Sequence, residues 1–228
     1  GLFTPWMNSV NAMNKGLGVK LYVAGKLGKG PAKQFKRAVD GVADISFGLQ
    51  GYTSKQFRAT TLVELADVMT SAVDGTKRLQ AAYAKSAAVR KEYDKVHVLG
   101  IWTIDVPIIM TKNKPIKSIA DLKGLKLRTP GSKTRILSFE MLGASPIKMN
   151  MGEIYLALQQ GVIDGQENPY GNIVSKSWYE VQKYISVSRH VYTPITFVMN
   201  LKRYNSLTSD QKAKVNRAAK KAVQMSRD

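Results

Sequence analysis

Apolar residues recur along the chain with the spacings that distinguish helices from strands. This pattern predicts helices over residues 2–14, 31–41, 61–69, 74–92, 132–142 and 151–160, and a last helix that opens at Thr208. It predicts strands or extended segments over residues 19–28, 43–49, 97–111, 125–130, 145–149 and 184–200. Because strands and helices alternate, we expect an α/β fold with parallel βαβ units.

Residues at the helix ends support these boundaries. Pro31 stands in the first turn of one helix and Gly41 at its end, while Asp74 is a candidate N-cap. Thr208 and Gln211 have the spacing of a capping box at the start of the last helix. The apolar stripe of that helix is formed by Val215, Ala218, Ala219, Ala222 and Val223.

Two long extended segments each contain a proline well inside them, Pro107 and Pro194. Proline cannot donate to a strand ladder, so it marks an edge or a point where a strand leaves a sheet. We therefore predict that the chain crosses twice between two α/β lobes, with a hinge of crossing strands and a ligand cleft. The predicted lobe I comprises residues 1–105 plus 195–228, and the predicted lobe II comprises residues 106–194.

Charge is the unusual feature of the composition. The chain of 228 residues has 35 Lys and Arg against 16 Asp and Glu, a net charge of +19. Such a charge attracts polyanions, but the basic residues are scattered, and those of the last helix are typical of a solvated face. We expect no nucleic-acid partner, and a basic polyanion-binding protein remains the alternative. The chain has no Cys, which excludes disulfides and thiolate chemistry, and no stretch reaches the ~18 apolar residues of a membrane span.

Nothing in the sequence predicts a catalytic centre, a metal site or a cofactor. His97 and His190 lie inside apolar segments, where structural roles are typical. Asp164 and Glu167 are a candidate carboxylate pair for a metal-assisted hydrolase, but Asp164 lies between two glycines and is explained by a turn. The glycine-rich stretch "GKLGKGP" matches no phosphate-binding pattern. We therefore expect a binding protein rather than an enzyme.

Three residues have side chains suited to holding a small anion. Arg128 lies near the end of a strand that leads into a helix, where ligands of α/β sheets gather, and its guanidinium matches a carboxylate. The alternative is an ordinary surface arginine. Asn168 can both donate and accept hydrogen bonds. Met151 opens an amphipathic helix and packs either in the core or against a ligand.

Several stretches resemble the solute-binding proteins of TRAP (tripartite ATP-independent periplasmic) transporters of the DctP type. The stretches are "SIADLKGLKLRTPGS", "LGASPIKMNMGEIYLALQQGVIDGQENPYGNI" and "YEVQKYISVSRHVYTP". The resemblance is strong over residues 116–205 and weaker over residues 19–110. It implies a periplasmic two-lobe clamp that captures a small organic acid and delivers it to the membrane permease subunits of the transporter. We expect a monomer.

The resemblance also implies roles for individual residues. It assigns the salt bridge with the ligand carboxylate to Arg128 and an amide contact to Asn168. It makes Glu167 a supporting partner of Arg128. The further ligand contacts that it implies are Met151, Gln50, Leu49 and Trp102.

Departures from the family pattern narrow these expectations. Leu49 stands where sialic-acid-binding members have an acidic residue, and there is no second arginine near Ile108. We therefore expect a monocarboxylate, a 2-oxo acid or an aromatic acid rather than sialic acid. The usual opening strand, the last helices of the second lobe and a signal peptide are not visible, so the chain reads as truncated at both ends.

Overall fold

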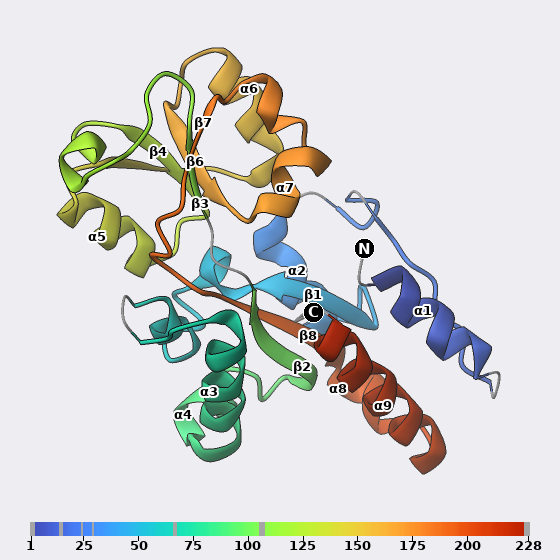
Figure 1. The fold of residues 1–228 in the computed structure, drawn as a ribbon. Helices are drawn as coiled ribbons and strands as arrows, with labels where there is room; N and C mark the ends of the chain where they lie inside the picture. Colours follow the sequence, from blue (N-terminus) through green and yellow to red (C-terminus); the bar gives the residue numbers. More distant parts are fainter. Residues whose placement is uncertain are drawn as a thin grey trace. The chain divides into compact units, whose positions relative to one another are not determined.

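The computed structural model describes residues 3–13, 16–23, 25–28, 30–65, 68–104 and 108–225. The helices are α1 (Phe3–Ala12), α2 (Gln34–Val39), α3 (Ala72–Lys85), α4 (Ala87–Lys91), α5 (Lys133–Met141), α6 (Ile154–Gln159), α7 (Tyr170–Ser175), α8 (Leu201–Asn205) and α9 (Ser209–Met225). The strands are β1 (Ile45–Leu49), β2 (Val96–Ile104), β3 (Ile108–Thr111), β4 (Lys126–Thr129), β5 (Ser145–Lys148), β6 (Gly165–Asn168), β7 (Tyr184–Ser186) and β8 (Thr193–Asn200). Figure 1 shows these elements along the chain.

The chain divides into two compact units. The first comprises residues 1–49, 76–104 and 194–228, and the second comprises residues 50–75 and 105–193. This division differs from the predicted one in residues 50–75, which we expected in the first lobe. They belong to the second unit, where Arg128 donates a hydrogen bond to the hydroxyl of Tyr52 and Glu64 pairs with Arg135. Pro107, one of the two predicted crossing points, lies outside the described residues.

The first unit is built on a three-stranded sheet with the order β1-β8-β2. Strands β1 and β8 are antiparallel, with Phe47 opposite Phe197. Helices α1 and α9 pack together, and α9 also packs on β2 (Figure 1). The predicted apolar stripe of α9 is buried in this core, which is formed by Trp6, Val10, Leu99, Trp102, Ile195, Phe197, Met199, Leu207, Val215, Ala218, Ala219, Ala222 and Val223.

The strand predicted over residues 19–28 is wrong for the part of it that the structure describes. Residues 17–23 have no regular secondary structure, and residues 25–27 form a turn. The parallel βαβ unit expected here is therefore also wrong, because β1 pairs with β8 from the far end of the chain. Because β8 is far from β1 in the sequence, the apolar spacing around β1 gives no indication of this pairing.

Two predicted helices differ in detail, and one predicted cap is confirmed. The helix expected over residues 74–92 is interrupted at Ser86, whose hydroxyl accepts from the amide of Val89 and caps α4. Asp74 lies inside the first turn of α3 rather than at its N-cap. The residues 60–64 form a 3-10 helix in place of the expected α-helix. At the last helix, Thr208 and Gln211 exchange hydrogen bonds of 3.0 and 3.3 Å as a capping box does.

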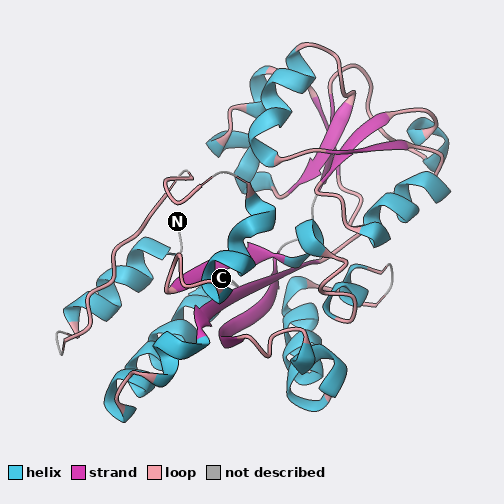
Figure 2. Cartoon of the chain, turned by 180° about the vertical axis from the view of Figure 1, so that it is seen from behind, coloured by secondary structure: helices cyan, strands magenta, loops and turns pink. Residues whose placement is uncertain are grey.

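The second unit is built on a five-stranded mixed sheet with the order β5-β4-β6-β3-β7. Strand β4 is parallel to β5 and β6, whereas β3 is antiparallel to β6 and β7. Helix α5 covers one face, and α6 and α7 cover the other (Figure 1). Figure 2 shows the two sheets from behind. One apolar cluster contains Ile109, Leu122, Leu127, Phe139 and Ala144, and the other contains Ile108, Met110, Ile154, Ala157, Leu158, Ile163, Ile173 and Trp178.

The stretch "GQEN" forms the buried strand β6, which the apolar spacing does not predict. Gly165 lies against β3, so closely that an added Cβ would be 2.4 Å from the carbonyl oxygen of Met110. Its glycine is required for this approach and not for a turn. Asp164 accepts from the amide of Lys126 at 2.8 Å, which joins the start of β6 to the start of β4.

Candidate ligand-binding site

Strand register decides which polar side chains share a face of the second sheet. Arg128 on β4 is opposite Gln166 on β6, and the two strands are parallel. Side chains alternate between the two faces of a strand. Arg128, Gln166 and Asn168 therefore share one face, the face covered by α6 and α7, whereas Thr129 and Glu167 share the other.

Arg128 is a buried guanidinium that has no counter-charge among the described residues. The residue is 2% exposed. Its Nε donates to the carbonyl of Met149 at 2.9 Å, and its Nη2 is bonded to the hydroxyl of Tyr52 at 2.9 Å. A guanidinium has five N–H donors. The donors of Arg128 that are not used in these two bonds have no partner in the described part of the chain. A buried, unpaired cation is costly, so this position is suited to an anion.

Asn168 belongs to a chain of amide side chains on the same face. Asn172 donates to the Asn168 carbonyl at 3.0 Å, and Asn168 donates to Gln166. Gln166 then donates to Gln182 at 3.0 Å, and Gln182 donates to the carbonyl of Met110 at 2.7 Å. The chain holds the Asn168 amide in one orientation and leaves it one further N–H to donate.

The other predicted contact residues lie in different parts of the fold. Gln50 is 2% exposed and lies in the same short 3-10 helix as Tyr52. Met151 is half-buried at the start of the 3-10 turn that precedes α6. Leu49 ends β1 and Trp102 lies in β2, so both belong to the first unit, and their part in binding stays a prediction. Trp102 is 1% exposed in the core of that unit.

Glu167 does not support Arg128, contrary to the expectation from the resemblance. Its carboxylate projects to the opposite face, where it accepts from Thr129 at 3.0 Å, Arg135 at 2.9 Å and His190 at 2.9 Å. Arg135 is on α5, and it also pairs with Glu64 at 3.2 Å. The residues Glu64, Arg135, Glu167 and His190, with Ser132 and Thr193 bonded to them, form what we call the buried charge network.

The two carboxylates of this network are not equivalent. Burial raises the pKa of Glu167, but Arg135 and His190 outweigh it and bring that pKa well below its usual value. For Glu64, burial prevails over Arg135 and Ser132, so its pKa is raised. Burial lowers the pKa of Arg135, and the two carboxylates more than reverse this, so Arg135 stays charged. Glu167 is thus the principal counter-ion of Arg135.

The histidines have the structural surroundings that were predicted. His97 stacks on Tyr204, with ring centroids 3.4 Å apart, and is bonded to Asn216 at 3.2 Å. His190 is bonded to Glu167 and Ser188. Across the described ranges there is no group of three or more His, Asp or Glu side chains placed to hold a metal ion. No helix within those ranges has the length and apolarity needed to cross a membrane.

Sequence reasoning missed the partners of Arg128 and Arg135, two of the buried arginines. Tyr52 follows Gln50 by two residues, so a search of the same segment for hydroxyl groups would have found it. Arg135 and Glu64 are separated by 71 residues, and no local signal links them. Arg135 stands in the helix after Arg128, and its burial appears only when α5 is placed on the sheet.

Residues 3–228 match the DctP family, described as "Bacterial extracellular solute-binding protein, family 7". One relative is the 2,3-diketo-L-gulonate-binding periplasmic protein YiaO of Escherichia coli, 38% identical over 122 residues, which are 53% of this chain and 37% of that protein. Another is the sialic acid-binding periplasmic protein SiaP of Vibrio cholerae, 38% identical over 111 residues, which are 49% and 35% of the two chains. The matched regions thus span well under half of these curated relatives.

Two solved structures of TRAP solute-binding proteins are also similar to this chain. A marine metagenome TRAP solute-binding protein specific for aromatic acids, in complex with 3-hydroxybenzoate, has a TM-score of 0.89 and 29% identity and matches 98% of this chain and 71% of its own. A TRAP solute-binding protein of Rhodoferax ferrireducens with copurified benzoate has a TM-score of 0.90 and 27% identity, with 99% and 71% coverage. The predicted two-lobe α/β fold is confirmed, and the chain belongs to the DctP family of bacterial extracellular solute-binding proteins.

Proposed function

We propose that this chain captures a small organic acid outside the cytoplasm and delivers it to the membrane permease subunits of a TRAP transporter. Arg128 is the residue that holds the carboxylate. The observation that carries the proposal is the burial of this guanidinium at 2% exposure with hydrogen bonds to Met149 and Tyr52 but no acidic partner among the described residues. We propose no enzymatic step.

The two existing bonds of Arg128 support a carboxylate at the remaining donors. They hold Nε and one N–H of Nη2, so the orientation of the planar fork is set before a ligand arrives. A bond between two charged groups contributes about 1.5–3 kcal/mol net. Asn168, on the same face of the sheet, is the second polar contact that we propose, and its amide is already oriented by Asn172.

The neighbourhood of Arg128 supports an acid with an apolar or aromatic body. Met149 accepts the Arg128 bond through its carbonyl, and its side chain and that of Met151 pack at the border of an apolar cluster. Thioether side chains make favourable contacts with aromatic rings. Two solved neighbours contain 3-hydroxybenzoate and benzoate, while another contains β-D-galacturonate. We therefore propose an aromatic or other small monocarboxylate, and Gln50 as a further contact.

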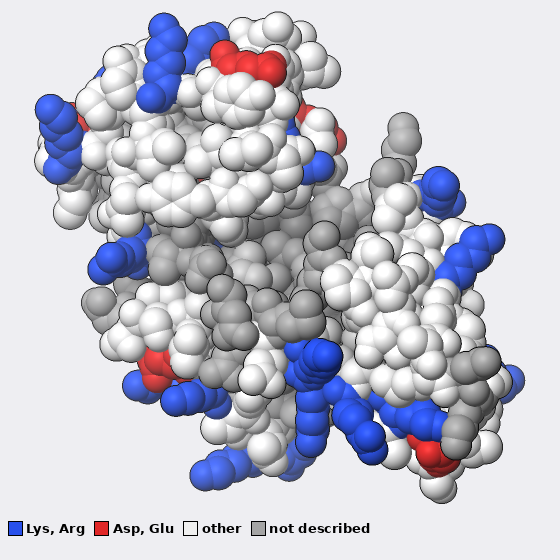
Figure 3. Space-filling model, turned by 45° about the vertical axis from the view of Figure 1, so that its right-hand side comes forward, with Lys and Arg blue, Asp and Glu red and all other residues white. Residues whose placement is uncertain are grey.

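The basic surface supports ligand attraction and gives no specific support to polyanion binding. On the face shown in Figure 3, Lys and Arg side chains occupy many separate places, with few Asp and Glu side chains among them. A continuous basic stripe is the usual footprint of nucleic-acid binding. A net charge of +19 spread in this way favours the arrival of small anions, and salt weakens the effect.

We propose that the protein acts as a monomer.

The test is calorimetric and thermal-shift titration of the protein with benzoate, 3-hydroxybenzoate and N-acetylneuraminate. For the acid that binds, Arg128→Ala is expected to weaken affinity about 10- to 150-fold, the equivalent of 1.5–3 kcal/mol. Arg128→Lys keeps the charge without the fork, so it should retain part of the affinity. The exposed Arg58→Ala in the same unit is the matched control and should bind normally.

The melting temperature of the unliganded protein separates a binding role from a structural one. Arg128→Ala loses two hydrogen bonds but also removes a buried, unpaired cation, so the unliganded protein should melt close to wild type. An Arg128→Ala variant that binds the acid as tightly as wild type would refute the proposal. Equal loss of binding in Arg58→Ala would also refute it, because the effect would then be one of general charge.

A further inference from the structure

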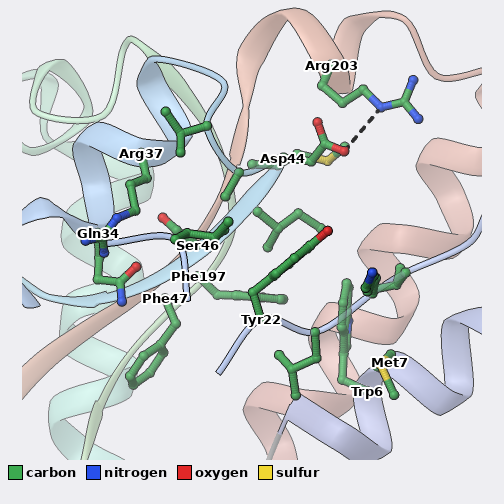
Figure 4. A pocket seen from close by; sticks show the side chains of 18 of the residues that line it. Trp6, Met7, Tyr22, Gln34, Arg37, Asp44, Ser46, Phe47, Phe197 and Arg203 are labelled. Carbon is green, nitrogen blue, oxygen red and sulfur yellow. Dashed lines mark ion pairs between the residues drawn. The ribbon is translucent and has the colours of Figure 1, made fainter. Parts of the chain in front are cut away.

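Polar groups with unused hydrogen-bonding capacity lie in both units. In the first unit, the indole Nε1 of Trp6 and the hydroxyl of Ser46 are buried without a partner among the described residues. Both residues line a cavity of about 650 Å³, where Figure 4 shows them on either side of Tyr22. The two groups are neutral, so they lack the counter-charge that an organic acid needs. In the second unit, the group with unused capacity is the hydroxyl of Tyr52, and it lies beside a cation.

The hydroxyl of Tyr52 keeps its own proton for another partner. Nη2 of Arg128 lies 2.9 Å from the phenolic oxygen, and a guanidinium has N–H donors only. Tyr52 therefore accepts in this bond, and its O–H is not used by Arg128. The hydroxyl makes no other hydrogen bond among the described residues. It is thus a free donor next to the position that we propose for the ligand carboxylate.

The segment that carries Tyr52 is packed firmly in place. Residues Gln50–Thr53 form a 3-10 helix. Gly51 lies so near the buried charge network that an added Cβ would be 3.1 Å from Oε1 of Glu64 and 3.4 Å from Cβ of Ser132. Close packing against a hydrogen-bonded cluster restricts the movement of a segment. Tyr52 therefore keeps its place before a ligand binds.

Geometry decides which ligand atom this donor can reach. The two N–H groups of one guanidinium nitrogen diverge by about 120°, so two acceptors on Nη2 lie about 5 Å apart. A carboxylate oxygen on the second N–H of Nη2 is thus too far from the Tyr52 oxygen for a direct hydrogen bond. An oxygen on the carbon next to the carboxyl group lies beside the carboxylate oxygen, and it can occupy the space between the two.

We infer that Tyr52 is a specificity-determining residue, which donates its O–H to a 2-oxo or 2-hydroxy oxygen of the bound acid. The inference rests on the proposed function, in which Arg128 holds the carboxylate, and it narrows the class of acid. The preferred ligand is a 2-oxo or 2-hydroxy acid with an apolar or aromatic body. An acid without this oxygen leaves the O–H of Tyr52 without an acceptor, which lowers affinity.

Tyr52 also has a positioning effect, which must be separated from this one. Its oxygen accepts from Arg128 and helps to set the orientation of the guanidinium. Loss of that bond weakens all carboxylic acids alike, since all of them use the same guanidinium. Loss of the donated bond weakens only the acids that carry the 2-oxygen. The ratio of two affinities therefore isolates the donor, whereas a single affinity does not.

The experiment measures the affinities of phenylacetate, phenylglyoxylate and mandelate by titration calorimetry, for wild type and Tyr52→Phe. The three acids share an aromatic body, and the carbon next to the carboxyl group carries no oxygen, a keto oxygen or a hydroxyl. Wild type is expected to bind phenylglyoxylate and mandelate more tightly than phenylacetate. In Tyr52→Phe this preference should fall about 2- to 12-fold, the equivalent of one hydrogen bond of about 0.5–1.5 kcal/mol.

Tyr155→Phe is the matched control. Tyr155 lies in the same unit and is half-buried like Tyr52, and its hydroxyl donates to Glu180 at 2.6 Å. Its replacement also removes one hydroxyl and one hydrogen bond, so the preference among the three acids should keep its wild-type value. Binding of phenylacetate by Tyr52→Phe shows that the variant is folded, and the preference of wild type tests the inference without any variant.

Three results would overturn the inference and leave the proposed function intact. The first is a wild type that binds phenylacetate, or benzoate, as tightly as the acids with a 2-oxygen. The second is a preference that is unchanged in Tyr52→Phe, because water or another donor then meets the 2-oxygen. The third is an equal fall in Tyr155→Phe. If wild type binds none of these acids, or if Arg128→Ala binds them as wild type does, the proposed function fails and the inference fails with it.

Discussion

The two carboxylates of the buried charge network should differ in their contributions to stability. Glu167 and Glu64 are each 2% exposed and each contact Arg135, so the substitutions Glu167→Gln and Glu64→Gln are closely matched. They differ in how the fold affects the charged form, because the pKa of Glu167 is lowered and that of Glu64 is raised. Replacing the carboxylate whose charged form is stabilised should cost more than replacing the one whose charged form burial disfavours.

The expected loss of stability in each variant follows from the hydrogen bonds and ion pairs of the carboxylate that is replaced. Glu167 accepts from Thr129, Arg135 and His190, and removing one member of a buried ion pair costs about 3–5 kcal/mol. Since Glu64 remains beside Arg135, we expect the lower end, about 3 kcal/mol, for Glu167→Gln. For Glu64→Gln we expect about 1 kcal/mol, the value of an ordinary hydrogen bond.

The double variant tests the network as a unit. With both carboxylates replaced, Arg135 is a buried cation at 4% exposure without a counter-ion in the network. The cost of the double variant should therefore exceed the sum of the two single costs by about 1 kcal/mol or more. Additive costs, or a larger cost for Glu64→Gln than for Glu167→Gln, would refute this account of the charges.

The pH dependence has a sign that follows from the lowered pKa of Glu167. A carboxyl whose folded pKa is lowered binds fewer protons in the folded state than in the unfolded state, so its contribution is present above its unfolded value of 4.5 and is lost below it. The raised pKa of Glu64 acts in the opposite direction, from its folded value down to 4.5. Wild type should lose stability below about pH 4.5, and Glu167→Gln should show a weaker loss there.

Urea unfolding of the second unit is the assay. Trp178 is buried in that unit, whereas Trp6 and Trp102 lie in the first, so its fluorescence reports the second unit when those two are replaced by Phe. The midpoint gives the change in the free energy of unfolding if the urea slope is unchanged between variants. A change in slope would show that the variant alters the unfolded state or the cooperativity instead.

Two further predictions concern glycine placement and capping. Gly165→Ala should destabilise by about 1–3 kcal/mol or more because its Cβ would meet the Met110 carbonyl at 2.4 Å; Gly161→Ala, whose Cβ meets open space at a φ of 72°, should cost about 1–2 kcal/mol. A cost of Gly165→Ala in urea unfolding under about 0.5 kcal/mol, the range of an ordinary surface substitution, would contradict this close approach. Thr208→Ala should cost about 1 kcal/mol through loss of its bond to the amide of Gln211, measured as the change in α9 hydrogen exchange, with Thr208→Ser near wild type.

The second unit was largely predictable from local sequence. The strand expected over residues 125–130 is β4, and the helix expected over 132–142 is α5. The helix expected over 151–160 begins as a 3-10 turn and continues as α6. These elements follow from apolar spacing and from stop signals such as Gly143, which are properties of adjacent residues.

The parts that could not be predicted depend on partners far away in the chain. Four polar or small residues at 165–168 have the composition of a turn, yet they form a strand because β3 and β4 supply partners on both sides. Residues 19–23 have the composition of a strand, yet no strand partner lies beside them in the described structure. The residue types in a segment limit the structures that it can adopt. Whether it forms a strand depends on whether another strand lies beside it.

The single strand β6 explains why one buried arginine is neutralised and another is not. Its alternation sends Glu167 to the face of α5, where Arg135 takes the carboxylate, and sends Gln166 and Asn168 to the face of Arg128. Uncharged amides cannot compensate a guanidinium, so the cation on that face keeps its capacity for an anion. A shift of one residue in the register of β6 would place Glu167 on the face of Arg128, where it could neutralise the guanidinium in place of the proposed ligand. The proximity of Gly165 to Met110 permits one register, and that register leaves Arg128 without an acidic partner among the described residues, as the proposed carboxylate contact requires.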